Sequence, residues 1–239
     1  MTSDDGAKGT ATGFPGVVQD SGERARLEAL VREVAVETGN VEGEAALRGA
    51  PVLAHFLALL RSENARMNLV SARAAEPEEL VRRHLFDALF GLRFLPEESK
   101  NAPLRLVDLG TGGGFPAVPI LLVRRDIQGV LVDSTEKKCA FLRRIVLELE
   151  LTAQVLNARF PSSFPMKNTR PFDLLTTRAV NGAGGLVRAA RPILRGRALL
   201  WTTETLARQA VQESGIHRST FHKAAGSESR GIAVLECFT

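Results

Sequence analysis

Residues 105–116, RLVDLGTGGGFP, place a carboxylate beside a stretch of bare backbone. An apolar run delivers Asp108, and four glycines among residues 110–114 follow before Phe115. Glycine lets a ligand approach the main chain closely. A strand, such a loop and a helix place this backbone at the carboxyl end of a parallel strand, where open α/β sheets bind ligands. The stretch therefore predicts a site for a ligand that lies against the chain.

The glycine spacing and a second acid favour S-adenosylmethionine as that ligand. Gly110, Gly112 and Gly114 follow G-x-G-x-G, whereas dinucleotide-binding loops follow G-x-G-x-x-G, which argues against a nucleotide-dependent dehydrogenase. Asp133 ends the next expected strand, about 20 residues later, where an acid can accept both ribose hydroxyls. We expect Asp108 to orient the amino group of the cofactor, directly or through water. The competing interpretation is a tight turn with Asp133 as a helix cap.

Two features that methyltransferases use for particular acceptors are missing from the expected core, and their absence limits which acceptor is methylated. Methylation of a pyrimidine ring carbon needs a cysteine nucleophile, but Cys139 falls mid-helix and Cys237 in the last expected strand. An exocyclic amine is usually held by an Asp/Asn-Pro-Pro-aromatic loop after the fourth strand, where this chain has TTRAVNGAGG. Guanine N7 carries an in-plane lone pair and needs alignment but no general base. The sequence is compatible with that acceptor.

Helical periodicity dominates the first 95 residues. We expect one amphipathic helix from Ser21 to Gly39, a second with Pro51 in its first turn, and a third starting near Pro77. After Pro103, short apolar runs alternate with helical segments, which is typical of strands and crossover helices in a parallel sheet. The final segment, STFHKAAGSESRGIAVLECF, indicates two strands joined by a Gly- and Ser-rich turn.

These patterns predict an α/β, Rossmann-like fold: a mainly parallel sheet with a C-terminal antiparallel hairpin and a helical N-terminal extension. We divide the chain into a disordered tail (1–22), a helical portion (23–95) and a methyltransferase core (96–239). The expected strands lie near residues 104–109, 129–133, 154–157, 172–176 and 198–202, and the helices of the core near 117–124, 135–149, 183–194 and 204–214.

The composition indicates what kind of protein this is and where in the cell it is expected. Of 239 residues, 44% are hydrophobic and 24% charged, as in one globular domain with an appendage. Two isolated cysteines offer no disulfide or metal spacing, and no run of about 18 apolar residues is present to cross a bilayer. We expect a soluble, cytoplasmic monomer without a metal. The net charge of +4 favours a polyanionic partner, although it also fits a plain solvated surface.

Four stretches of the chain resemble the successive motifs of one family. They are MNLVSARAAEPEELVRRHLFDAL (67–89), LRLVDLGTGGGFPAVPI (104–120), LVDSTEKKCAFLRRI (131–145) and TTRAV (176–180). They resemble the bacterial 16S ribosomal RNA guanine-N7 methyltransferase family, RsmG, also called glucose-inhibited division protein B. The resemblance runs from about residue 25 to about residue 200. It implies a helical portion on a class I methyltransferase core that uses S-adenosylmethionine to methylate guanine N7 in 16S rRNA of the small ribosomal subunit.

The resemblance also implies roles for single residues. Gly110 and Phe115 would contact the cofactor, Asp133 would meet its ribose, and Arg178 would flank both the cofactor and the target base. His84 and Asp87, one helical turn apart, match the family's His and Asp before the core and are candidates for positioning. The alternatives are purely structural roles: an ion pair for Arg178, and a polar seam between the two portions for His84 and Asp87.

One helix expected after Asp133 is basic. Its cations are candidates for contacts with RNA phosphates, and the alternative is a face that only meets solvent. The same two alternatives apply to Arg82 and Arg83. The four residues are Lys137, Lys138, Arg143 and Arg144.

Two departures from the family pattern leave alternatives open. Family members usually carry an acid after the third strand to meet the adenine amine, and here Pro161 follows Phe160, whose backbone groups remain available to the adenine. The fifth strand normally ends in a lysine and glycine turn, and here it reads ALLWTTETL. The alternatives are a member that binds RNA or ribosomal subunits without methylating them, and a class I methyltransferase with another acceptor.

Overall fold

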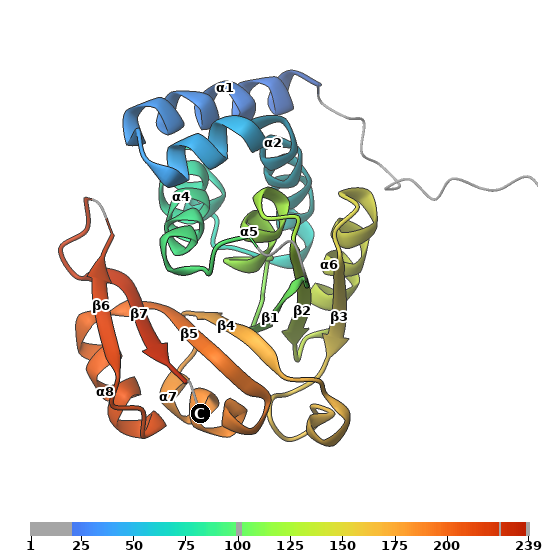
Figure 1. Ribbon diagram of the computed structural model, residues 1–239. Helices are drawn as coiled ribbons and strands as arrows, with labels where there is room; N and C mark the ends of the chain where they lie inside the picture. Colours follow the sequence, from blue (N-terminus) through green and yellow to red (C-terminus); the bar gives the residue numbers. More distant parts are fainter. Residues whose placement is uncertain (1–20, 99–101, 225, 238–239) are drawn as a thin grey trace, which may run out of the picture.

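The computed structural model describes residues 21–98, 102–224 and 226–237. Most of the expected tail, residues 1–20, lies outside this part, while its last two residues, Ser21 and Gly22, belong to the first helix. Helices precede the sheet along the chain, and an antiparallel pair of strands ends it (Figure 1). The predicted fold class is thereby confirmed.

The N-terminal helices form a layer of their own above the sheet (Figure 1). Helix α1 packs along α2, and a shorter helical run follows. The elements are α1 (Ser21–Thr38), α2 (Val41–Met67), η1 (Arg73–Ala75), α3 (Pro77–Glu79), η2 (Leu80–Leu85), α4 (Phe86–Leu89) and η3 (Phe90–Phe94).

The expected start of the second helix at Pro51 is wrong. Helix α2 begins ten residues earlier, at Val41, because the Asn40 side chain accepts hydrogen bonds from the N–H groups of Glu42 and Gly43 and so caps the helix. Pro51 lies inside the helix. The buried alanines around it, Ala50 and Ala54 among them, keep this stretch packed in the core despite the hydrogen bond that a proline removes.

The core contains seven strands in the order β3-β2-β1-β4-β5-β7-β6. Strands β1 to β5 are parallel, and the hairpin of β6 and β7 joins antiparallel to β5. The strands are β1 (Leu104–Leu109), β2 (Ile127–Asp133), β3 (Ala153–Asn157), β4 (Phe172–Arg178), β5 (Leu194–Thr203), β6 (Ser219–Lys223) and β7 (Arg230–Glu236). The helices of the core are α5 (Ala117–Val123), α6 (Glu136–Glu148), η4 (Met166–Asn168), α7 (Ala183–Ala190), η5 (Arg191–Ile193) and α8 (Glu204–Ser214).

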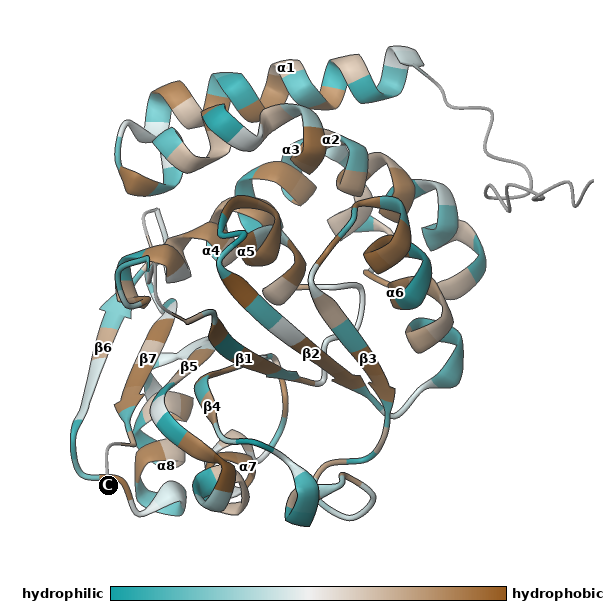
Figure 2. Cartoon of the chain, turned by 45° about the vertical axis from the view of Figure 1, so that its right-hand side comes forward, coloured by the Kyte–Doolittle hydropathy of each residue, from teal (hydrophilic) through white to brown (hydrophobic). Residues whose placement is uncertain are grey.

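Side chains alternate between the two faces of the sheet, as a strand period of two requires. In β4, Leu174 packs with the N-terminal helices, α5 and α6, whereas Leu175 packs with α7 and α8. In β5, Leu199 and Leu200 divide in the same way. Figure 2 shows the apolar strands and the apolar helix α5 between the helical layers. The N-terminal helices therefore share one apolar core with the sheet.

No helix in the described ranges is long and apolar enough to cross a membrane.

A single leucine tests the shared core. Leu60 of α2 is 0% exposed, and a Cβ on Gly113 of the glycine loop would lie 3.2 Å from its Cδ1 atom. Leu60→Ala should lower the free energy of unfolding by about 2–5 kcal/mol, because it leaves a cavity beside that loop. Urea denaturation followed by circular dichroism measures the change.

Leu147→Ala is the matched control, since Leu147 of α6 is 76% exposed. It should change the free energy of unfolding by less than about 0.5 kcal/mol. Equal, small effects of both substitutions would contradict the shared core.

Candidate active site

The glycine loop has the backbone conformation that only glycine adopts readily. It joins β1 to α5, and Gly110, Gly112 and Gly114 have φ angles of +76°, +58° and +101°. A Cβ on Gly110 would lie 2.8 Å from the Cγ2 atom of Val180, in the loop after β4. The loops that follow the two central strands thus meet over bare backbone.

Asp108 is buried at the carboxyl end of β1, and only one of its two carboxylate oxygens accepts a hydrogen bond from a described side chain. Its exposure is 1%, and Thr176 of the adjacent strand β4 donates a hydrogen bond of 2.7 Å to its Oδ1 atom. Its Oδ2 atom has no hydrogen-bond partner among the described residues. Burial raises the pKa of this carboxyl group to about 7, against the opposing effect of the hydrogen bond from Thr176. A buried acceptor without a partner fits a cationic donor that arrives with a ligand.

Asp133 ends β2 and holds the glycine loop. Its Oδ2 atom accepts the N–H of Gly112 at 2.9 Å, and its Oδ1 atom accepts the N–H of Thr135, just before α6, at 2.8 Å. These contacts are the ones that the competing interpretation, a tight turn beside the start of the helix, requires, and the ribose contact of Asp133 stays a prediction. Each carboxylate oxygen retains a second lone pair that can accept a hydroxyl group.

The two aromatic candidates differ in their surroundings. Phe115 is 6% exposed, and its ring lies 5.4 Å from that of Phe56 and 5.5 Å from that of His84. Phe160 is half-buried, and its ring lies 5.2 Å from that of Phe164. Phe115 thus joins the glycine loop to the N-terminal helices, and the cofactor contacts of both residues remain predictions.

Arg178, at the end of β4, binds the helical portion. Its guanidinium donates to Asp87 Oδ2 at 3.3 Å and to the main-chain carbonyls of Arg83 and His84 at 3.1 and 3.5 Å. These carbonyls belong to η2, a π-helical turn in which the N–H of Phe86 reaches the carbonyl five residues back. Such turns disturb the regular helix ladder and recur at functional sites. The three positioning candidates are therefore brought together, in a polar seam between the two portions.

Burial and two nearby arginines set the charge of His84. Burial, together with Arg178 and Arg230, lowers the pKa of His84 to about 4. The imidazole is neutral at neutral pH. For Asp87, burial raises the pKa, while the charges of Arg178, Arg230 and Arg83 lower it in part.

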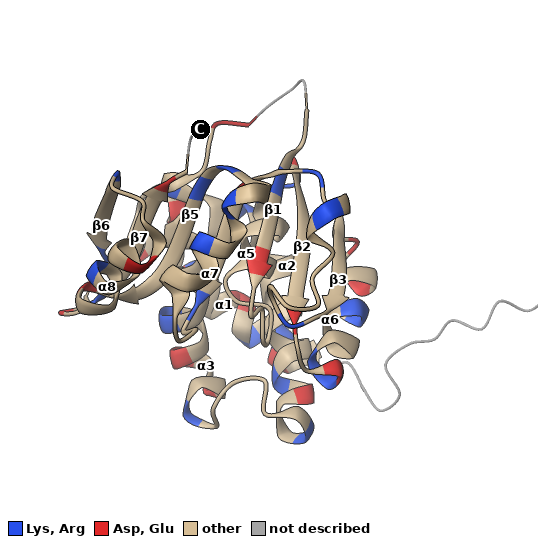
Figure 3. Cartoon of the chain, turned by 90° about the horizontal axis from the view of Figure 1, so that it is seen from below, with Lys and Arg blue, Asp and Glu red and all other residues tan. Residues whose placement is uncertain are grey.

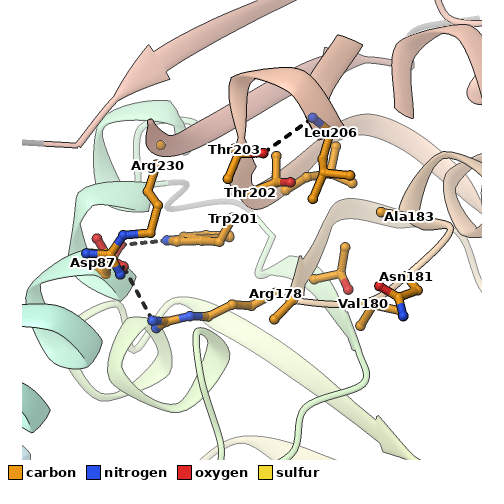
Figure 4. A pocket seen from close by; sticks show the side chains of 14 residues that line it. Asp87, Arg178, Val180, Asn181, Ala183, Trp201, Thr202, Thr203, Leu206 and Arg230 are labelled. Carbon is orange, nitrogen blue, oxygen red and sulfur yellow. Dashed lines mark hydrogen bonds and ion pairs between the residues drawn. The ribbon is translucent and has the colours of Figure 1, made fainter. Parts of the chain in front are cut away.

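A cavity of about 410 Å³ opens beside this seam, at the carboxyl ends of β4 and β5 (Figure 4). Asp87, Arg178 and Arg230 converge at one end, Trp201 lies along the wall, and Val180 lies at the other end. The indole N–H of Trp201 donates to the main-chain carbonyl of Asp87 at 2.6 Å.

Sequence reasoning missed Arg230. It is the first residue of β7 and pairs opposite Thr203 at the end of β5. Only the antiparallel return of the hairpin brings it to the cavity, where its guanidinium lies 3.9 Å from Asp87 Oδ2. The short apolar run of residues 231–235 predicts a strand, but nothing local indicates which strand it joins.

The basic residues of α6 are only partly available. Arg143 pairs with Glu136 at 2.7 Å, and Arg144 pairs with the buried Glu63 of α2 at 3.3 Å. Lys137 is exposed and Lys138 half-buried. Acidic and basic positions both occur along α6 (Figure 3), and two of its four cations already face carboxylates.

The other two ambiguous arginines, Arg82 and Arg83, also face carboxylates. Arg82 pairs with Glu37 at 2.5 Å, and Arg83 pairs with Glu79 at 3.1 Å. No cluster of three or more metal-binding side chains occurs in the part of the chain that the structure describes.

Comparison with known proteins places this architecture in a family. The family model described as "rRNA small subunit methyltransferase G" (GidB) matches residues 50–222. The methyltransferase domain of METTL16 superposes with a TM-score of 0.56 at 11% identity, over 80% of this chain and 81% of that one, a likeness in fold alone. The fold is that of class I S-adenosylmethionine-dependent methyltransferases.

Curated relatives carry the same description, "Ribosomal RNA small subunit methyltransferase G". The protein of Leptothrix cholodnii is 36% identical over 145 residues, 61% of this chain and 64% of that protein. The protein of Sorangium cellulosum is 32% identical over 189 residues, 77% of each. The chain thus spans less than two thirds of the first relative. Together with the family model, these matches establish that the chain belongs to the rRNA small subunit methyltransferase G family.

Proposed function

We propose that this chain transfers a methyl group from S-adenosylmethionine to N7 of a guanine in 16S rRNA of the small ribosomal subunit. The observation that carries the proposal is the buried carboxylate of Asp108, with Oδ2 unpartnered among the described residues, next to a loop of positive-φ glycines. Family membership supports the same activity. A cytoplasmic monomer, with portions divided at residues 95 and 96, remains part of the proposal.

The residues at the ends of β1 and β2 fit the cofactor. Asp108 Oδ2 would accept from the amino group of its methionine part, and the spare lone pairs of Asp133 would accept from its ribose hydroxyls. Gly110, Gly112 and Gly114 would leave the backbone open beneath it. Phe115, Phe160 and Arg178 are proposed as further contacts. When bound, S-adenosylmethionine supplies an electrophilic methyl group on a sulfonium ion.

The side chains around the cavity position an acceptor and do not deprotonate one. His84 is half-buried, and its pKa, lowered to about 4, makes its imidazole a weak base, while the Asp87 carboxylate is held by Arg178. Guanine N7 has a lone pair ready for attack, so alignment and a suitable electrostatic field supply the catalysis. We therefore assign His84, Asp87 and Arg178 to positioning.

The RNA partner is proposed to dock partly through Lys137 and Lys138, near the start of α6. Phosphate contacts position a nucleic acid without reading its sequence. Arg143 and Arg144 contribute less, because carboxylates already face them. The alternative of an inactive RNA-binding member would be favoured by a damaged loop or a lost acid, and Asp108, Asp133 and the glycines are all in place.

The ribose contact predicts a change in cofactor affinity. Asp133→Asn should weaken S-adenosylmethionine binding about tenfold or more, since an amide cannot accept both hydroxyls. Isothermal titration calorimetry measures the affinity. Asp126→Asn, just before the amino end of β2, is the matched control and should leave the affinity unchanged; equal losses in both variants would contradict the proposed ribose contact.

The buried Asp108 predicts a pH-dependent stability. Its folded-state pKa, about 7, lies above the ordinary value of 3.8, so the native state holds the proton between these values. The contribution of this group to stability is full below pH 4 and is lost as the pH rises through 7. Asp108→Asn should therefore be more stable than the wild type at pH 8 by a few kcal/mol, since one pKa unit is about 1.4 kcal/mol, and of similar stability at pH 4.

Urea denaturation of both proteins across this pH range measures the difference. A difference that does not depend on pH would contradict the raised pKa.

The lysines of α6 predict a change in salt dependence. Lys137→Ala combined with Lys138→Ala should weaken RNA binding and reduce the slope of log affinity against log salt by about one to two. Filter binding at several salt concentrations measures the slope. Arg143→Gln is the control, with a smaller effect expected because Glu136 already pairs with Arg143. An unchanged slope in the lysine variant would assign these residues to a solvated face.

A further inference from the structure

The polar end of the cavity has a defined arrangement of charge (Figure 4). Asp87 is the only acidic residue among the described side chains that line the cavity, and its side chain is 17% exposed. The hydrogen bond from Arg178 falls on Oδ2, as does the closest approach of Arg230. Oδ1 accepts no hydrogen bond from a described residue. One oxygen is thus held in place and the other remains available to a donor.

Arg230 stands next to that carboxylate with donors to spare. Its side chain is 42% exposed, and the 3.9 Å separation from Asp87 is an ion-pair distance longer than a hydrogen bond. A guanidinium carries five N–H donors, so Arg230 can approach Asp87 and still donate to a neighbouring acceptor. The cavity therefore presents an acceptor and a donor side by side.

We propose that Asp87 and Arg230 together recognise the Watson–Crick edge of the target guanine, an inference that rests on the proposed function. That edge carries two adjacent donors, N1–H and the N2 amino group, followed by the O6 acceptor. Asp87 accepts from N1–H and N2–H with Oδ1 and with the second lone pair of Oδ2, and Arg230 donates to O6. Arg178 is a positioning residue that fixes the carboxylate.

This recognition leaves N7 free. N7 lies on a different edge of the base, and its lone pair takes no part in the contacts with Asp87 and Arg230. Val180, at the far end of the cavity, approaches the position that a Gly110 Cβ would take to 2.8 Å, so that end borders the proposed cofactor site. A base held at the Asp87 end can therefore present N7 toward the cofactor.

The same arrangement rejects the other purines. Inosine lacks the N2 amino group and gives up one charge-assisted hydrogen bond to Asp87. Adenine places the lone pair of N1 against the carboxylate and its amino group against Arg230, so both contacts become repulsive. The substitution Asp87→Asn supplies an amide donor and an acceptor, which complement adenine better than guanine.

Trp201 provides a direct readout of binding. It is the only tryptophan of the chain, which contains no tyrosine, and it lines the cavity. Its fluorescence should change when a base enters. The experiment titrates the full-length protein with single-stranded RNA pentamers that contain one central guanosine, inosine or adenosine between pyrimidines.

We expect the guanosine pentamer to bind about tenfold more tightly than the inosine pentamer and more tightly still than the adenosine pentamer. Asp87→Asn should abolish the preference for guanosine over inosine and improve adenosine relative to guanosine. Arg230→Gln should weaken guanosine and inosine equally, because both carry O6. Glu79→Gln is the matched control: it removes an acid that pairs with Arg83 outside the cavity, and the wild-type preference should persist.

Equal binding of guanosine and inosine pentamers to the wild type would overturn the proposal, as would an undiminished preference in Asp87→Asn. No fluorescence change with any pentamer would also overturn it, because no base would then enter beside Trp201. These outcomes concern binding alone, so they are separate from a failure of methyl transfer. Chemical denaturation of each variant verifies that it is folded.

Discussion

The attachment of the N-terminal helices to the carboxyl end of the sheet is the interaction on which the rest of the site depends. Arg178, at the end of β4, donates hydrogen bonds to two main-chain carbonyls of η2 and to Asp87. Phe115 joins the glycine loop to Phe56 and His84 by ring contacts. Apolar packing supplies the stability, and these polar contacts fix the orientation. Because the cavity draws Asp87 from the helices and Trp201 and Arg230 from the sheet, it exists only when the two portions are joined.

Local patterns in the sequence identified much of this structure. The apolar runs ending at Asp108 and Asp133 form neighbouring parallel strands, and three of the glycines between them adopt the left-handed backbone that a bare loop requires. The C-terminal hairpin was predicted from two strand-like segments joined by a Gly- and Ser-rich turn. Such features were predictable because strand period, turn chemistry and glycine conformation act over a few residues.

Other features depend on contacts between distant segments, which no local pattern encodes. Asn40 caps a helix that continues through Pro51, so the proline did not mark a helix start. Arg144, expected on an RNA-binding face, meets Glu63 of a helix about 80 residues earlier in the chain, at 3.3 Å. Arg230 reaches the cavity only through the pairing of β7 with β5. The sequence located the cofactor loop better than the acceptor pocket, because one loop builds the former and four separate segments build the latter.

Methyl transfer itself is the measurement that tests the account most directly. The purified protein is incubated with methyl-labelled S-adenosylmethionine and unmodified small ribosomal subunits, and the label is located by chemical cleavage at N7-methylguanine. The account predicts label at a single guanine of the 16S rRNA. Label on another base or on protein, or no transfer by a protein that binds the cofactor, would contradict it.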